Sequence, residues 1–269
     1  MSPNKIISLS LQNLLKSEKF RSGLKILSIF IIAVLLVILF TSFRIIRKKT
    51  VRFKAEDGLL ITANHFFSKK SSPYILLLHQ EQSSRGEFDS IAGRFVKMNY
   101  NCLAIDLRSG FKHGFVDNET AKNFIKNGKP ANILESLRDI KAAIDYIWNL
   151  SGEDVILFGS GSAASLALIE GKENKHVKAI IAFSPGEYFR PGIDMKTFLS
   201  GYPKSVYIGT SDQEFNYIQD MFSGMDGKNK IVFRPNFGHV SRGTSALLRS
   251  NPTHDEYWLS LLIYFKSLK

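Results

Sequence analysis

The sequence predicts an α/β protein with a mostly parallel, doubly wound sheet that carries helices on both faces. Short apolar runs, typical of buried strands, alternate along the chain with stretches whose apolar residues recur at helical spacing. Two runs joined by Asp57 and Gly58 come first and predict a hairpin. Strands that alternate with helices after one opening hairpin favour a parallel sheet. In such a sheet the functional residues lie beyond the carboxyl ends of the strands.

Three segments are expected: a basic amphipathic tail over residues 1–23, a transmembrane anchor over 24–43 and one folded domain over 51–269. For residues 1–20, a helix on a membrane surface and a loosely ordered tail are equal alternatives. Residues 26–43 contain no charged side chain, and about 18–20 apolar residues is the lower limit for a membrane-spanning helix. Residues 39–43 are a poor cleavage site for a signal peptide. We therefore expect an uncleaved single-pass anchor. Because both flanks are basic, the charge pattern does not decide on which side of the membrane the folded domain lies.

The formal net charge of +12 is concentrated before the predicted domain. Residues 1–54 hold eleven Lys and Arg residues against one acidic residue, which leaves 25 basic and 23 acidic residues for the rest of the chain. Basic residues that flank an apolar stretch indicate lipid headgroups rather than phosphodiesters. The membrane is therefore an expected partner, and nucleic acid is not.

Cysteine and histidine usage indicates neither a disulfide nor a metal site. The single cysteine, Cys102, lies within an apolar run, which predicts a packed core thiol. The sequence contains no CxxC or HExxH motif and no other close cluster with metal-ligand spacing. No metal and no cofactor are therefore expected.

The elements of the domain follow from apolar runs, helical spacing and turn residues. The helix after the third strand places Phe88, Ile91, Phe95 and Met98 on one face, and Pro130 opens a later helix. Residues 111–129 are expected to form a long polar loop. Strands are expected over residues 51–55, 59–67, 74–78, 101–105, 155–158, 177–183, 205–209 and 230–234. Helices are expected over residues 87–98, 130–150, 165–169, 215–225 and 254–268.

The stretch from Val155 to Leu168 organises the chain, because an apolar strand is followed by a cluster of tiny residues and then an apolar helix. A strand that turns sharply into a helix through small residues is the geometry of a nucleophile elbow, G-x-S-x-G. Two registers fit. With Gly159 as the first glycine the apex is Gly161, which carries no nucleophile, and with Ser160 in that place the apex is Ser162.

The order of these parts resembles the α/β-hydrolase fold, and within it the dienelactone-hydrolase-like group of serine hydrolases, over about residues 51–269. The matching pieces are Leu78-His79-Gln80 with Ser83-Ser84-Arg85, Ala104-Ile105-Asp106-Leu107-Arg108, residues 159–168, Phe183-Ser184-Pro185-Gly186, Gly209-Thr210-Ser211-Asp212 and the Gly238-His239 region.

The resemblance implies a Ser, an acid and a His in that chain order, with backbone N–H groups as oxyanion donors. Asp212 matches the family acid, and the oxyanion donors match Glu81 and the residue after the apex, Ser162 or Ala163. The family register places Gly161 at the apex. Arg242-Gly243-Thr244 resembles the family's His-Gly-Thr segment, so Arg242 stands where the His belongs and His239 lies three residues earlier.

Two functions remain open from the sequence. The first is a membrane-anchored relative of carboxylic-ester hydrolases that is catalytically impaired or non-catalytic because of Gly161, with a small acyl compound as its expected ligand. The alternative is an active serine hydrolase of esters, thioesters or lactones that uses Ser162, His239 and Asp212. In both, His79 is expected to be structural, and Asp106 and Arg108 are expected to form a buried pair under the site.

Overall fold

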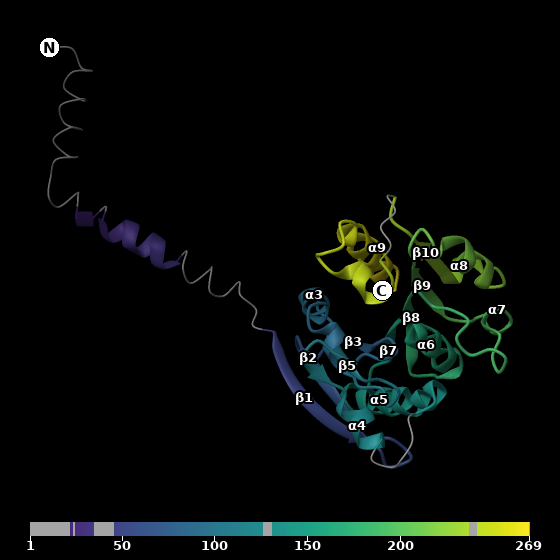
Figure 1. The fold of residues 1–269 in the computed structure, drawn as a ribbon. Helices are drawn as coiled ribbons and strands as arrows, with labels where there is room; N and C mark the ends of the chain where they lie inside the picture. Colours follow the sequence, from purple (N-terminus) through teal and green to yellow (C-terminus); the bar gives the residue numbers. More distant parts are fainter. Residues whose placement is uncertain (1–21, 24, 35–45, 126–130, 237–240, 269) are drawn as a thin grey trace, which may run out of the picture. The chain divides into compact units, whose positions relative to one another are not determined.

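The computed structural model describes residues 22–23, 25–34, 46–125, 131–236 and 241–268 (Figure 1). Contacts divide the chain into two units, Met1–Ile45 and Ile46–Lys269. In the first unit the described residues are helical. No helix among the described residues has both the length and the apolarity required to cross a bilayer. The predicted tail lies almost wholly, and the predicted anchor partly, outside the described residues.

The second unit is built on one eight-stranded sheet with the order β1-β2-β4-β3-β7-β8-β9-β10. β1 and β2 pair antiparallel, as do β2 and β4, and the remaining neighbours are parallel. The predicted mostly parallel sheet is therefore confirmed. The strands are β1 (Arg47–Lys54), β2 (Leu60–Phe67), β3 (Tyr74–Leu78), β4 (Asn101–Ile105), β7 (Val155–Ser160), β8 (Val177–Phe183), β9 (Ser205–Gly209) and β10 (Lys230–Phe233).

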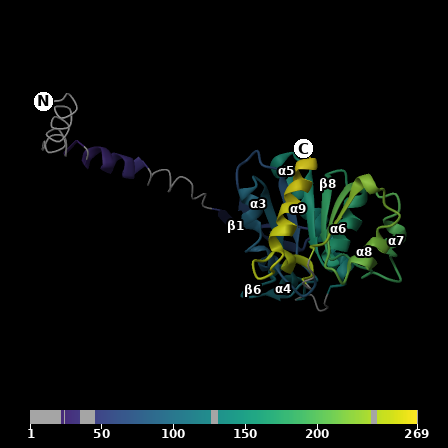
Figure 2. The same cartoon turned by 90° about the horizontal axis from the view of Figure 1, so that it is seen from above.

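Helices cover both faces of this sheet, as predicted. α3 (Ala92–Lys97) and α9 (His254–Ser267) lie side by side on one face, as Figures 1 and 2 show. Their contact includes Phe95 and Trp258, whose ring centroids are 5.0 Å apart. The other face carries α5 (Ser136–Ser151), α6 (Ser162–Glu173) and α8 (Phe215–Met221). Apolar residues of these helices and of the strands form the buried core on that face.

Helix boundaries follow local capping more closely than the apolar pattern. The Asn132 side chain accepts a hydrogen bond from the Leu134 N–H, and Glu135 accepts one from the Asn132 N–H, which completes a capping box. The predicted helix from Pro130 therefore starts later, as η2 (Ile133–Glu135) and α5. α5 ends at Gly152, which has a left-handed φ of 69°.

Two predicted segments differ from the structure. The expected helix over residues 87–98 is divided into η1 (Arg85–Phe88), capped by Ser84, and α3. The expected loop over residues 111–129 contains β5 (Lys112–His113), β6 (Val116–Asp117) and α4 (Glu119–Ile125). These short elements depend on contacts with distant parts of the chain. Val116 packs so closely on Gly86 that a Cβ at Gly86 would lie 2.6 Å from the Val116 Cβ. Thr120 Oγ1 accepts a hydrogen bond from the Thr62 N–H at 2.9 Å.

Candidate functional site

The turn between β7 and α6 has Gly161 at its apex. Its backbone torsion angles are φ 59° and ψ −126°, a conformation that residues with a Cβ rarely adopt. The small residue at Gly159 is required by the same turn, because a Cβ there would lie 2.4 Å from the Ala163 carbonyl oxygen. β7 and α6 thus pass so closely that only a glycine fits at the base of the turn.

At Gly161 itself the surroundings leave space for a side chain. A Cβ at this position would lie 3.4 Å from the Gln80 Cβ, which is ordinary van der Waals contact. The same Cβ would lie 4.0 Å from the Gln80 Oε1, and a Cβ on Gly243 would lie 3.7 Å from that oxygen. The Gln80 side chain therefore lies between the apex of the turn and the loop that follows β10.

The serines on either side of Gly161 lie outside the apex of the turn. Ser162 is the first residue of α6, its side chain is buried, and its hydroxyl has no hydrogen-bond partner among the described residues. Ser160, the last residue of β7, accepts a hydrogen bond at Oγ from the Thr244 N–H at 3.1 Å. Neither hydroxyl is carried by the apex residue of the turn.

A carboxylate that the sequence analysis did not single out, Glu214, follows β9 and is held by several contacts. The Glu214 Oε2 accepts hydrogen bonds from the hydroxyls of Ser184 at 2.9 Å and Ser211 at 3.0 Å, and its Oε1 lies 3.2 Å from the Nε of Arg242. Ser184 has a φ of 52° and accepts a hydrogen bond from the Gly243 N–H at 2.9 Å. The ends of β8 and β9 thereby hold Glu214 against the loop after β10.

The predicted acid, Asp212, pairs with another residue. The Asp212 side chain is 57% exposed and pairs with Arg234 instead. His239 lies within residues 237–240, outside the described residues, so its role stays a prediction. Arg242, which the sequence resemblance places where the family's His belongs, contacts Glu214.

Hydrogen bonds with His79 and Glu87 fix the position of the loop after β3. His79 Nε2 accepts a hydrogen bond from the Leu107 N–H at 2.9 Å, so its Nδ1–H donates to the Gln80 carbonyl oxygen at 2.8 Å. Burial lowers the pKa of His79, which favours this neutral imidazole. Glu87 accepts hydrogen bonds from the Gln80 N–H at 3.1 Å and the Thr244 hydroxyl at 2.7 Å. These contacts fit the expected structural role of His79.

The predicted oxyanion donors lie in this loop and in the first turn of α6. Glu81 is exposed and directly follows Gln80, whereas Ser162 and Ala163 are buried in the first turn of α6. Backbone N–H groups in the first turn of a helix have no intrahelical acceptor. The first turn of α6 therefore places such N–H groups next to Gly161, and the roles of Glu81, Ser162 and Ala163 stay predictions.

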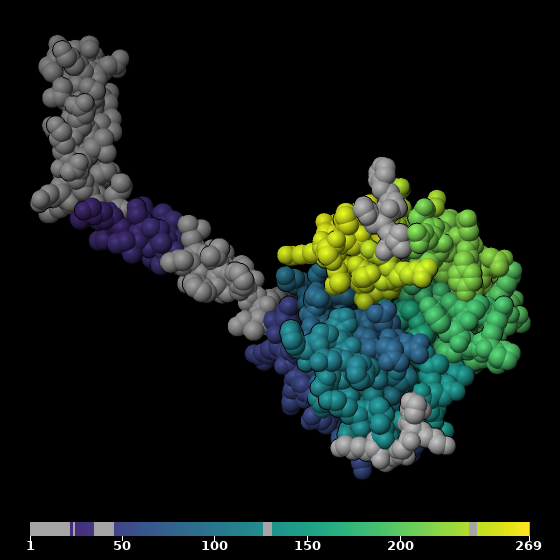
Figure 3. Space-filling model, in the orientation of Figure 1, coloured from purple at the N-terminus to yellow at the C-terminus, as the bar shows by residue number. Residues whose placement is uncertain are grey.

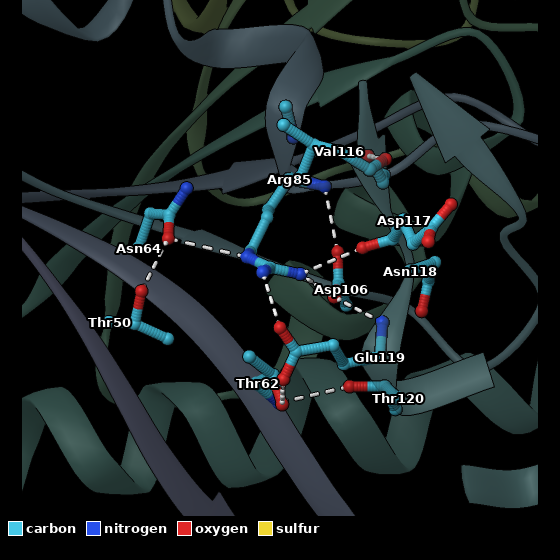
Figure 4. A network of polar contacts seen from close by, with 12 residues as sticks. Thr50, Thr62, Asn64, Arg85, Asp106, Val116, Asp117, Asn118, Glu119 and Thr120 are labelled. Atoms are coloured by element: carbon cyan, nitrogen blue, oxygen red, sulfur yellow. Dashed lines mark hydrogen bonds and ion pairs between the residues drawn. The ribbon is translucent and has the colours of Figure 1, made fainter. Parts of the chain in front are cut away.

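The prediction that Asp106 and Arg108 form a buried pair is wrong. Asp106 pairs with Arg85, which also contacts Glu119 at 2.7 Å (Figure 4). Arg108 turns toward α5 and pairs with Asp139 at 2.6 Å. The side chains of Asp106 and Arg108, which follow β4, extend toward different helices, and each pairs with a residue that is distant in sequence. Among the described residues, no group of His, Cys, Asp or Glu side chains is arranged to hold a metal ion.

Six parallel strands, a hairpin at one edge and a sharp strand-to-helix turn after β7 define the architecture. The chain has the α/β-hydrolase fold. A putative dienelactone hydrolase from Klebsiella pneumoniae is similar over 83% of this chain and 99% of its own, with a TM-score of 0.62 and 12% identity. A dienelactone hydrolase from Anabaena variabilis is similar over 81% and 95%, with a TM-score of 0.59 and 15% identity.

An esterase from Pyrococcus furiosus is similar over 81% of this chain and 90% of its own, with a TM-score of 0.58 and 16% identity. Searches with the sequence find no matching protein-family model and no matching curated protein. At such low identity the likeness establishes the fold, and the predicted resemblance to α/β-hydrolases is confirmed at that level.

Proposed function

We propose that this protein is a relative of carboxylic-ester hydrolases that has lost most or all of its hydrolytic activity. The observation that carries the proposal is Gly161 at the apex of the turn after β7. Hydrolases of this fold carry the attacking side chain on the apex residue. A glycine provides no oxygen or sulfur for covalent attack, so the acyl-enzyme step of the reaction has no nucleophile at this position.

The pair of Arg242 and Glu214 supports the same conclusion. A general base must be able to release and take up a proton near neutral pH, as an imidazole does. A guanidinium stays protonated in proteins, so Arg242 does not replace a histidine in that role. Arg242 forms an ion pair with Glu214, and its side chain is 65% exposed. The Arg242 guanidinium and the N–H groups in the first turn of α6 suit a small acyl compound with a carbonyl or carboxylate group as ligand.

The test is hydrolysis of short acyl esters and labelling by a fluorophosphonate, with the full chain and a Ser162→Ala variant. The proposal expects no fluorophosphonate adduct on any serine. It also expects equal, near-background ester hydrolysis by both proteins. Covalent labelling at Ser162, with turnover that Ser162→Ala removes, would instead support the serine hydrolase that uses Ser162, His239 and Asp212.

We further propose that residues 24–43 anchor the protein in a membrane by a single pass. The support is the uncharged stretch over residues 26–43 and the eleven basic residues among the first 54. After alkaline extraction of membranes, the intact chain is expected to remain in the membrane fraction. Release into the aqueous fraction with its first residues intact would contradict the anchor.

A further inference from the structure

The edge of the sheet opposite the candidate site carries a surface that the proposed function does not use. At this edge the β2–β3 loop and the residues before β4 meet the C-terminal half of α9. A pocket of about 340 Å³ opens there, lined by residues that include Lys69, Tyr100, Leu262, Phe265 and Lys266. We call Lys69, Lys70, Leu259, Leu262, Ile263 and Lys266 the basal surface.

The apolar part of the basal surface is the outer face of α9. Leu259, Leu262 and Ile263 are 60%, 38% and 59% exposed, and Lys266 completes their row at the next helical turn. Positions separated by three, four and seven residues lie on one face of a helix. The opposite face of α9 is also apolar and is buried against the sheet. The helix therefore presents apolar side chains at the molecular surface, a feature typical of an interaction site. Figure 3 draws the C-terminal part of the chain, which includes α9, in yellow.

The polar part of the basal surface is positively charged. Lys69, Lys70 and Lys266 are exposed, and the residues that line the pocket include no Asp or Glu. Ser72 also lines this pocket, and its buried hydroxyl has no hydrogen-bond partner among the described residues. Apolar side chains bordered by lysines match an interface with anionic lipid headgroups.

The chain enters the folded unit at the same edge. Ile46 packs on α3, where a Cβ on Gly93 would meet its Cδ1 at 2.9 Å. Arg47, the next residue, pairs in register with Phe67, two positions before Lys69. In the sequence only two residues separate Phe43, where the uncharged stretch ends, from Ile46. A chain of that length spans at most about 11 Å, so an anchored protein has its folded unit close to the bilayer.

We propose that the basal surface docks the folded unit on an anionic lipid bilayer, an inference that rests on the proposed membrane anchor. Leu259, Leu262 and Ile263 enter the headgroup region, while Lys69 and Lys266 contact lipid phosphates. Because the turn at Gly161 follows the carboxyl end of β7, it lies at the opposite edge of the sheet. In the docked state the candidate site therefore faces the aqueous phase and takes its ligand from there.

The experiment places an environment-sensitive fluorophore on the full chain in lipid vesicles. Leu262→Cys carries the label at the basal surface, and Phe115→Cys, at a fully exposed position on the β5–β6 turn, is the matched control at the other edge. Native Cys102 is buried and does not compete for the label. Headgroup nitroxide lipids are expected to quench the label at position 262 and not at 115. Quenching is expected to be stronger with phosphatidylglycerol in the vesicles than with phosphatidylcholine alone.

Charge removal provides the second measurement. The double variant Lys69→Ala, Lys266→Ala is expected to lower the ratio of docked to undocked protein about fivefold for each lysine. Lys112→Ala, Lys122→Ala removes two exposed lysines beside the β5–β6 turn and is expected to leave it unchanged. Quenching at position 115 instead of 262, or equal effects of the two double variants, would overturn the proposal.

Alkaline extraction of the same vesicles separates the two proposals. A chain that resists extraction but shows no quenching at position 262 keeps the anchor and overturns docking. A chain that neither resists extraction nor binds vesicles overturns both. A dimer in solution that Leu262→Asp dissociates, without lipid quenching, would assign the basal surface to a second copy and overturn the proposal.

Discussion

Replacing Gly161 by serine tests directly whether this turn is a vacated nucleophile position. The space is available, because the new Cβ would lie 3.4 Å from the Gln80 Cβ. The cost comes from the backbone, since φ 59° and ψ −126° are rarely adopted by residues with a Cβ. Such strain costs about 1–3 kcal/mol. At about 2–4 °C for each kcal/mol in a domain of this size, Tm is expected to fall by about 2–12 °C.

The single variant Gly161→Ser restores a hydroxyl but no base, so its ester hydrolysis is expected to stay close to background. Adding Arg242→His places an imidazole beside Glu214. General-base catalysis contributes about 10²- to 10⁴-fold, so the double variant is expected to exceed the single variant by a factor in this range. Thermal unfolding, fluorophosphonate labelling and hydrolysis of a chromogenic ester provide the measurements.

A matched control is Gly152→Ser, at an exposed glycine with a φ of 69° and no atom within 4 Å of its new Cβ. It shares the positive φ but lies away from the site, so its stability is expected to fall without any change in labelling. An unchanged Tm for Gly161→Ser, together with no gain of activity by the double variant over the single variant, would contradict a vacated nucleophile position.

The remaining predictions concern buried and partly buried groups. Glu214→Gln weakens the hydrogen bonds that the carboxylate accepts and is expected to lower the unfolding free energy by about 1–3 kcal/mol. Arg242→Ala, at the exposed end of the pair, is expected to lower it by at most about 1 kcal/mol. Denaturant titration of the two variants measures both values. Burial lowers the pKa of His79 and His65, so each takes up a proton less readily in the folded state than in the unfolded chain, where protonation begins at about pH 6.5. Unfolding free energy is therefore expected to fall as pH decreases from about 6.5, by up to about 1.4 kcal/mol per pH unit for each group, and a flat profile between pH 7 and 5 would contradict this. Burial raises the pKa of the Cys102 thiol, so a thiol reagent is expected to react with it only in denaturant, and rapid reaction with the folded chain would show that the site is open.

The sequence predicted the central strands well because those strands are buried on both faces. The bounds of β3, β4, β8 and β9 agree with the predicted ranges, and almost every residue in them is buried. A strand covered by helices on both sides consists of a nearly continuous apolar run, which is visible without any tertiary information. The short elements between residues 111 and 125 lack such a run, so their structure depends on contacts with η1 and β2 that the sequence does not reveal.

For the site, the sequence determined that a tight turn between an apolar strand and an apolar helix lies within the small residues from Gly159 to Ala164. It left open whether Gly161 or Ser162 is at the apex, because small residues at neighbouring positions satisfy the same pattern. Only the tertiary structure decided this, since the backbone torsion angles of Gly161 depend on how β7 and α6 pack.

The partners of the charged residues were decided in the same way. Two acids, Asp212 and Glu214, follow β9 two positions apart, and their order in the chain does not indicate which one pairs with Arg242. Packing turns Glu214 inward to Arg242 and Asp212 outward to Arg234. Apolar patterning is a local property that the sequence records directly, whereas the pairing of charges between distant segments exists only once the sheet has brought the ends of its strands together.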